Sequence, residues 1–188
     1  MNGRKFSGAL LMDGAAFDDA VQWIYREYTD VTPLLLLHGT GYEPIAEAGP
    51  ILIGASIGSL IYRHWQAGTN AMADAVWLES RIPVQTLFSS LQRRLRVLAP
   101  DRREFWLRLG MAGPLRQAWQ EHQQWPDGFW HGVDRVWLHH AGAVHCAWNN
   151  PSPERDCTRP TDNLLEAQVV LDWPLLQALA ATDPQEVD

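Results

Sequence analysis

A serine between two glycines is the first feature of this sequence that could do chemistry. The segment Gly54-Ala55-Ser56-Ile57-Gly58 follows a short apolar run, and α/β-hydrolases hold their nucleophile in a Gly-x-Ser-x-Gly turn between a strand and a helix. His38-Gly39 ends an earlier apolar run, as do the loops that donate backbone N–H groups to an oxyanion. An acid and three histidines follow in the order that a catalytic triad needs: Asp134, His139, His140 and His145. Ser56 is therefore a candidate nucleophile.

The spacing of these pieces argues against a hydrolase. His38 and Ser56 are 18 positions apart, which leaves room for a short helix and one strand. The oxyanion loop and the nucleophile normally belong to strands separated by two helices and a further strand. Both pieces also have simple structural explanations, because Ser56 can cap the following helix and Gly39 can end a strand. We therefore predict that the chain is not an enzyme, and keep a serine hydrolase that uses Ser56 as an alternative.

Four potential metal ligands lie close together in the sequence: His139, His140, His145 and Cys146. A predicted hairpin that turns at Ala141-Gly142 places His139 and Cys146 on one face and the other two histidines on the opposite face. A zinc site needs three or four converging ligands, so this division predicts no metal. The Gly-rich motifs that bind phosphates or dinucleotides are also absent, and we predict no cofactor.

Length and composition indicate a soluble globular protein. The 188 residues can bury one sizeable core, and 46% are hydrophobic. No apolar run reaches the roughly 18 residues that cross a bilayer, so we expect no membrane partner. The net charge of -7 argues against a nucleic-acid partner. One local group of arginines is interpreted as the solvated face of a helix: Arg93, Arg94, Arg96, Arg102 and Arg103. Arg4 and Lys5 precede an apolar run too short for a secretory signal, which predicts a cytoplasmic location.

Strands and helices alternate along most of the chain. Apolar runs predict strands at 9–12, 34–37, 51–53, 75–79 and 104–109. Helical spacing predicts helices at 17–28, 43–47, from Ser56 to a stop at Gly68, and at 83–98, 114–124 and 175–181. A hairpin with arms at 133–139 and 143–148 precedes the last helix. The predicted fold class is α/β, with a mixed sheet and packed helices in an N-terminal lobe, residues 1–110, and a smaller irregular α+β lobe, residues 111–188.

The order of the apolar segments resembles a known family. "ALLMDGAAF", "TPLLLLHGTGYEPIAEAGPILI", "ADAVWLESRIPVQTLFSSLQRRLRVLAPDRREFWLRL" and "PLRQAW" resemble the type VI secretion effector adaptors, also called Tap or Tec chaperones, over residues 8 to about 119. Where that family has an aromatic-Asp-Pro ending after its last strand, this chain has "LRLGMAGPL". No role of the missing acid is therefore carried over.

The resemblance implies a non-enzymatic adaptor. Such a protein binds a cognate toxic effector in the producing cell and helps load it onto the spike-tip protein of the secretion apparatus, with a variable C-terminal lobe contributing to effector choice. An immunity protein that neutralises a toxin is a further alternative. Within "QWPDGFW", we predict that Trp125, Phe129 and Trp130 bind the partner, because turn residues are usually exposed. These aromatics could instead fold back onto the core.

Overall fold

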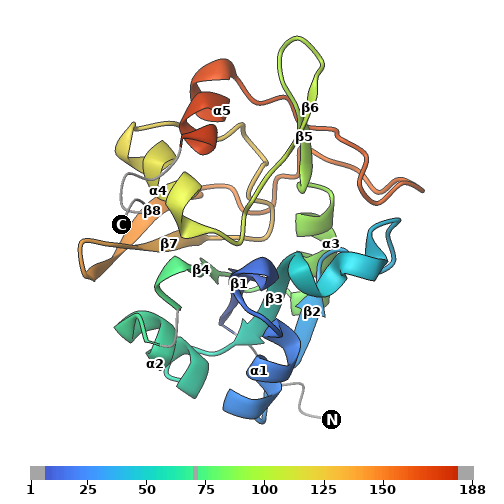
Figure 1. Cartoon of the computed structure of the whole chain (residues 1–188). Helices are drawn as coiled ribbons and strands as arrows, with labels where there is room; N and C mark the ends of the chain where they lie inside the picture. The colour runs from blue at the N-terminus through green and yellow to red at the C-terminus, as the bar shows by residue number, and fades with distance from the viewer. Residues whose placement is uncertain (1–6, 70–71, 182–188) are drawn as a thin grey trace.

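A six-stranded sheet forms the centre of the computed structural model, which describes residues 7–69 and 72–181 (Figure 1). Its order is β2-β3-β1-β4-β7-β8, with β1 (Gly8–Asp13), β2 (Pro33–Leu35), β3 (Pro50–Ala55), β4 (Val76–Glu79), β7 (Arg135–His140) and β8 (Ala143–Asn149). Neighbouring strands run antiparallel throughout this sheet. The predicted α/β class, with helices on a sheet and a smaller C-terminal part, is confirmed.

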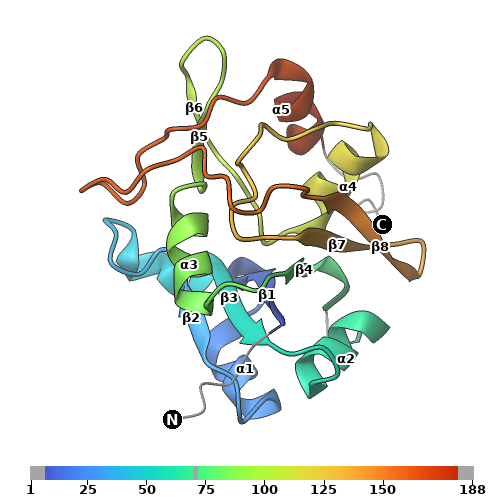
Figure 2. The same ribbon diagram turned by 180° about the vertical axis from the view of Figure 1, so that it is seen from behind.

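Helices cover both faces of the sheet (Figures 1 and 2). On β1, Ala9 and Leu11 point into one buried cluster and Leu10 and Met12 into the other, as the alternation of side chains along a strand requires. The first cluster includes residues of α3 (Val84–Gln92), α4 (Ala112–Gln120) and α5 (Trp173–Ala180). The second includes residues of α1 (Ala20–Glu27) and α2 (Leu60–Ala67). Because β1 is buried on both faces, it reads as a continuous apolar run.

The end of β1 lies where Asp13-Gly14 predicted it. The Asp13 carboxylate accepts a hydrogen bond of 3.0 Å from the Ala15 N–H and starts a short 3-10 turn, η1 (Gly14–Ala16). A Cβ on Gly14 would lie 2.0 Å from the carbonyl oxygen of Glu47, so only glycine fits there. That carbonyl belongs to a second 3-10 segment, η2 (Glu43–Ala48), which covers the predicted helix at 43–47.

The cap of α2 is Ser59, and the prediction that Ser56 caps this helix is wrong. The Ser59 hydroxyl accepts a hydrogen bond of 3.4 Å from the Tyr62 N–H. Gly58 has a φ of 86°, a left-handed conformation that a helix cannot contain, so the helix begins only after it. Gly68, with a φ of 66°, ends the helix as predicted.

The helix predicted at 83–98 ends at Gln92, which is a correction of the sequence interpretation. The chain then turns into a second, two-stranded sheet of β5 (Arg96–Leu98) and β6 (Glu104–Trp106). This hairpin projects at the top of Figure 1. Leu95 and Leu98 continue the helical spacing of α3 in the sequence, but Leu95 is buried after a turn rather than on the helix.

The predicted hairpin near residue 140 is confirmed. Ala141 and Gly142 form its turn, with φ values of 50° and 78°, as expected of a two-residue hairpin loop. Through β7 the hairpin pairs with β4, so residues on both sides of the predicted lobe boundary at 110 share one sheet and one buried cluster. The division into an N-terminal lobe, residues 1–110, and a variable C-terminal lobe, residues 111–188, stays a prediction.

Two further observations concern sequence predictions about membranes and targeting. Within the described residues, every helix is too short or too polar to cross a membrane. Arg4 and Lys5, on which the expected cytoplasmic location rests, lie outside the described residues.

Candidate partner-binding surface

The candidate triad residues of the hydrolase alternative do not assemble around Ser56. Strand register runs in one row from Ala55, beside Ser56, through Gly8 and Glu79 to Arg135. His139 lies four residues farther along β7, about 13 Å along the strand and about 14 Å across three strand spacings. His140 is one residue beyond it, and His145 pairs with Leu138 on the next strand. Hydrogen-bond contact between Ser56 and these histidines is therefore impossible in this fold.

The other triad candidates have structural partners. Asp134 accepts two hydrogen bonds from the Arg81 guanidinium, at 2.8 and 3.1 Å. His139 is 8% exposed and its Nε2 donates to the carbonyl oxygen of Trp65. These contacts join the hairpin to α2 and to the segment after β4, which gives both residues a role in packing.

The histidines of the hairpin divide between two faces, as predicted. The His139 ring packs edge-on against Trp65, whereas the rings of His140 and His145 both lie beside Trp119, with centroids 5.8 and 5.3 Å away. Burial raises the pKa of the Cys146 thiol, which keeps the sulfur protonated. Across residues 7–69 and 72–181, no three His, Cys, Asp or Glu side chains are grouped to hold a metal ion.

The aromatics of "QWPDGFW" pack into the core. Phe129 is fully buried, Trp130 is 5% exposed and Trp125 is half-buried. The Trp125 ring stacks on Phe129 at 4.4 Å and meets Trp130 edge-on at 5.2 Å. The expectation that Phe129 and Trp130 lie exposed on a turn is wrong, and the alternative that they fold back onto the core is what the structure shows. Partner binding by this segment stays a prediction. Of its three aromatics, the half-buried Trp125 is the one with substantial exposed surface for a direct contact.

The turn buries its aromatics because an arginine holds its backbone. The Arg94 side chain, 1% exposed, donates hydrogen bonds to the carbonyl oxygens of Phe129 and Gly128, the latter at 2.9 Å, and to Asp156 at 2.6 Å. The interpretation of the local arginine group as a solvated helix face is therefore wrong for Arg94. Arg93 likewise bonds Asp156 at 3.0 Å and is largely buried.

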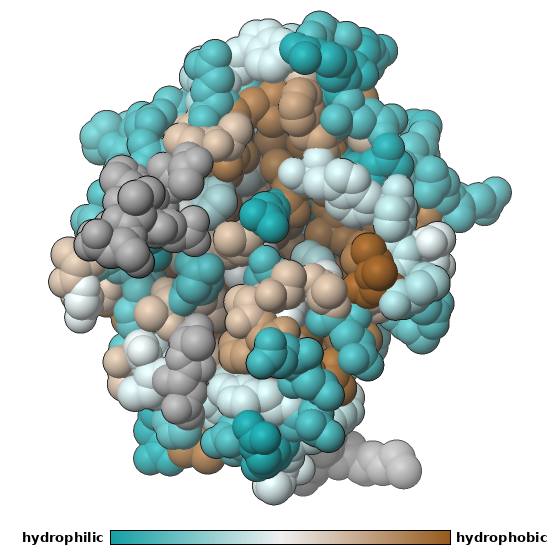
Figure 3. Space-filling view, in the orientation of Figure 1, coloured by the Kyte–Doolittle hydropathy of each residue, from teal (hydrophilic) through white to brown (hydrophobic). Residues whose placement is uncertain are grey.

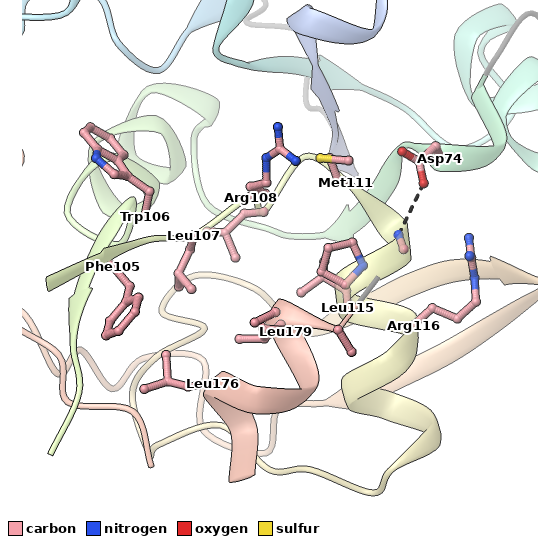
Figure 4. A pocket seen from close by; sticks show the side chains of 15 residues that line it. Asp74, Phe105, Trp106, Leu107, Arg108, Met111, Leu115, Arg116, Leu176 and Leu179 are labelled. Carbon is pink, nitrogen blue, oxygen red and sulfur yellow. Dashed lines mark hydrogen bonds between the residues drawn. The ribbon is translucent and has the colours of Figure 1, made fainter. Parts of the chain in front are cut away.

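An apolar hollow of about 430 Å³ lies between the second sheet and the last two helices (Figures 3 and 4). We call it the β6 groove and define it by five side chains that gather around it: Phe105, Leu107, Leu115, Leu176 and Leu179. They come from β6 and the segment after it, from α4 and from α5. In Figure 3 brown apolar atoms line this hollow and teal polar atoms surround it.

Trp106 lies at the edge of the β6 groove, next to a second hollow in the surface. Its side chain is 45% exposed and also lines a smaller hollow of about 150 Å³ together with Leu37 and Met111. The Tyr42 ring meets Trp106 edge-on at 5.1 Å, and the Arg96 guanidinium lies 5.5 Å from the indole centroid. Phe105, 37% exposed, points to the other side of the strand. Large exposed aromatics at the rim of an apolar hollow are typical of protein-binding surfaces.

Three charged residues line the β6 groove: Asp74, Arg108 and Arg116. Asp74 accepts a hydrogen bond of 3.2 Å from the Gly113 N–H at the start of α4, and Arg116 donates to the carbonyl oxygen of His139 at 2.8 Å. Arg108 is exposed at the rim, and its guanidinium makes no hydrogen bond or ion pair with the described part of the chain. Arg108 therefore places one exposed positive charge beside the apolar floor.

Sequence reasoning missed this surface. The pattern of residues 102–108, "RREFWLR", predicts a strand preceded by a basic helix face and predicts no special role for its two aromatics. One signal was available: two adjacent large aromatics flanked closely by arginines on both sides are unusual for a buried strand, in which charged residues are rare. The walls from α4 and α5 could not be inferred, because the helices come from distant parts of the sequence.

Comparison with known proteins gives one family. A family model described as a domain of unknown function, DUF4123, matches residues 10–126, a range that contains β6 and α4 but not α5. A search of curated proteins finds no match, and neither does a search of solved structures. Because the family model covers more than half of the chain, this protein belongs to the DUF4123 family.

Proposed function

We propose that this protein is a non-enzymatic adaptor of a type VI secretion system. It binds one cognate toxic effector in the cytoplasm of the producing cell and helps to load it onto the spike-tip protein. The observation that carries the proposal is the family match over residues 10–126, because the DUF4123 family is associated with type VI secretion effector adaptors.

The geometry supports a binding role. The β6 groove offers apolar floor residues and an exposed Trp106 within one connected surface, and buried aromatic contacts dominate the energetics of many protein interfaces. The residues that suggested hydrolysis instead hold elements together, as Asp134 does with Arg81 and His139 with Trp65. We therefore propose no catalytic, metal-binding or cofactor-binding residue.

Secretion of the effector encoded beside this gene tests the proposal. Deleting the gene should abolish delivery of that effector and leave delivery of the other effectors of the same apparatus unchanged. Restoring the gene should restore delivery. If delivery persists and the deletion strain instead becomes sensitive to the toxin, the protein is an immunity protein and the adaptor proposal fails.

Ester hydrolysis tests the non-enzymatic part separately. Purified protein and its Ser56→Ala variant should both leave a generic p-nitrophenyl ester uncleaved above the buffer rate. Turnover by the wild type that disappears in Ser56→Ala would show a serine hydrolase and overturn this part of the proposal.

A further inference from the structure

The open edge of β6 has backbone groups with no partner among residues 7–69 and 72–181. Antiparallel pairing alternates hydrogen-bonded and non-bonded residue pairs. The Leu107 N–H bonds Leu95 at 2.8 Å and the Arg103 carbonyl accepts from the Ala99 N–H at 2.8 Å. Between these two pairs, Glu104 and Trp106 therefore direct their N–H and C=O groups away from β5.

The opposite edge of the same small sheet is already occupied. Leu98 of β5 donates to the Val169 carbonyl at 2.8 Å and accepts from the Leu171 N–H at 2.9 Å, which forms a parallel bridge with Val170. In contrast, the described residues provide no hydrogen bond to the backbone of Glu104 or Trp106. All three residues of β6 are exposed, so a further strand has access to this edge.

We propose that β6 binds an extended segment of the effector as an additional strand. This inference rests on the adaptor function proposed above and names its binding site. Two N–H and two C=O groups on an exposed edge are what strand addition uses for affinity, and side-chain pockets next to the edge supply specificity. The β6 groove beside the strand takes apolar side chains at alternate positions of the added segment, and Trp106 covers the opposite side.

Charge identifies the kind of segment. Residues 96–108 contain four arginines and two acids in a chain of net charge -7. Arg96 pairs with Glu104 and Arg103 with Asp101, whereas Arg108 has no ionic partner among the described residues. A second copy of this chain would bring the same positive segment to the edge. The occupant is therefore an effector segment that alternates apolar residues and carries an acid opposite Arg108.

Substitution of Glu104 by proline distinguishes binding through the backbone of β6 from binding through its side chains. Glu104→Pro removes an outward N–H to which the described part of the chain makes no hydrogen bond, and proline is tolerated on an edge strand. Glu104→Ala removes the same carboxylate but keeps the N–H, which makes it the matched control. Thermal melts should show both variants folded. Titration calorimetry with the effector encoded beside this gene should show at least tenfold weaker binding for Glu104→Pro than for Glu104→Ala.

Hydrogen exchange provides a readout specific to strand addition. The amides of Glu104 and Trp106 should exchange rapidly in the free protein and become protected in the complex. Charge reversal at Arg108 provides a second test. Arg108→Glu should weaken effector binding about tenfold at low salt, whereas Arg63→Glu, at an exposed position on α2, should leave the affinity unchanged.

Each other outcome decides against the inference. Equal affinity of the two Glu104 variants with unprotected amides would overturn strand addition and leave the adaptor function standing. A loss of affinity in Phe105→Ala alone would then indicate a helix in the groove. Association of the free protein that Glu104→Pro abolishes would show that the edge pairs with a second copy. Absence of any binding to the effector would overturn both the inference and the proposed function.

Discussion

Arg94 and Asp156 form an ion pair of 2.6 Å between the end of α3 and a loop 62 residues later in the chain. The arginine side chain is 1% exposed and the carboxylate 22% exposed. Through the same guanidinium, Arg94 also holds the carbonyl oxygens of Gly128 and Phe129. One buried side chain therefore ties three segments together.

Loss of the Asp156 carboxylate should destabilise the protein strongly. Asp156→Asn keeps the side-chain size but leaves the buried Arg94 charge without its counterion, for which we expect a loss of about 2 to 3 kcal/mol in the free energy of unfolding. Urea denaturation measures it. Asp127→Asn is the control, since Asp127 pairs with Arg155 at an exposed site, and its unfolding midpoint should barely move. Equal shifts in the two variants would contradict the role of Arg94.

The Asp156 carboxylate should make the free energy of unfolding depend on pH. Burial alone would raise the pKa of Asp156, but hydrogen bonds from Thr158 and Arg94 and the charge of Arg94 lower it to about 2. An unfolded aspartate has a pKa of about 3.9, so this stabilisation is present above about pH 5 and is lost as pH falls toward 2. With allowance for solvent screening, the loss is about 1 to 2 kcal/mol.

Wild type and Asp156→Asn, unfolded by urea at pH values from 6 to 2, test this dependence. The stability difference between them should narrow as the pH falls. Parallel curves over the whole range would show that Asp156 titrates normally in the folded protein.

Trp130→Ala should unfold the protein far more readily than Trp106→Ala. Trp130 is 5% exposed and Trp106 is 45% exposed, and truncating a buried tryptophan costs about 3 to 5 kcal/mol. Trp130→Phe should lose much less, because its ring still fills most of the site and the buried Trp130 indole N–H has no hydrogen-bond partner among the described residues. Thermal melts of the three variants measure the order. A stable Trp130→Ala variant would contradict the buried placement.

Ser59→Ala should cost about 1 kcal/mol of stability, because it removes the side chain that caps α2. Ser89→Ala is the control: Ser89 is exposed within α3 and its hydroxyl bonds the Gln85 carbonyl of its own helix, where alanine is the better helix former. Chemical denaturation should show a loss for the first variant and no loss for the second. Similar effects would place the start of α2 elsewhere.

Local patterns predicted the first part of the sheet well. Asp13-Gly14 ended β1 because the aspartate side chain accepts a hydrogen bond from the Ala15 N–H, two residues later in the chain. Gly68 ended α2 and Ala141-Gly142 turned the hairpin for similarly local reasons. Each of these signals depends on backbone conformation at the residue itself.

The errors arose where distant segments decide the structure. Leu95 keeps the helical spacing of α3, but the helix ends at Gln92. Just beyond it, Arg94 bonds Ser90 of the helix and also Gly128 and Asp156, which lie 34 and 62 positions away. Trp130 was expected on a surface turn for the same reason, since the arginine that holds this turn cannot be identified from the turn's own sequence. The β6 groove likewise needs α5, whose place depends on packing rather than on periodicity.

Pairing of β7 with β4 has a consequence for how specificity can change among such proteins. Trp77 lies opposite Trp137, so the second half of the chain supplies the outer strands that cover β4. A chimera that joined residues 1–110 to a foreign C-terminal half would expose β4 as a bare, apolar edge unless the graft brought a strand in the same register. Partner preference should therefore be transferable between such proteins by exchanging loops or the residues that line the groove. Exchange of the whole C-terminal half should fail, because that half cannot be separated from the sheet.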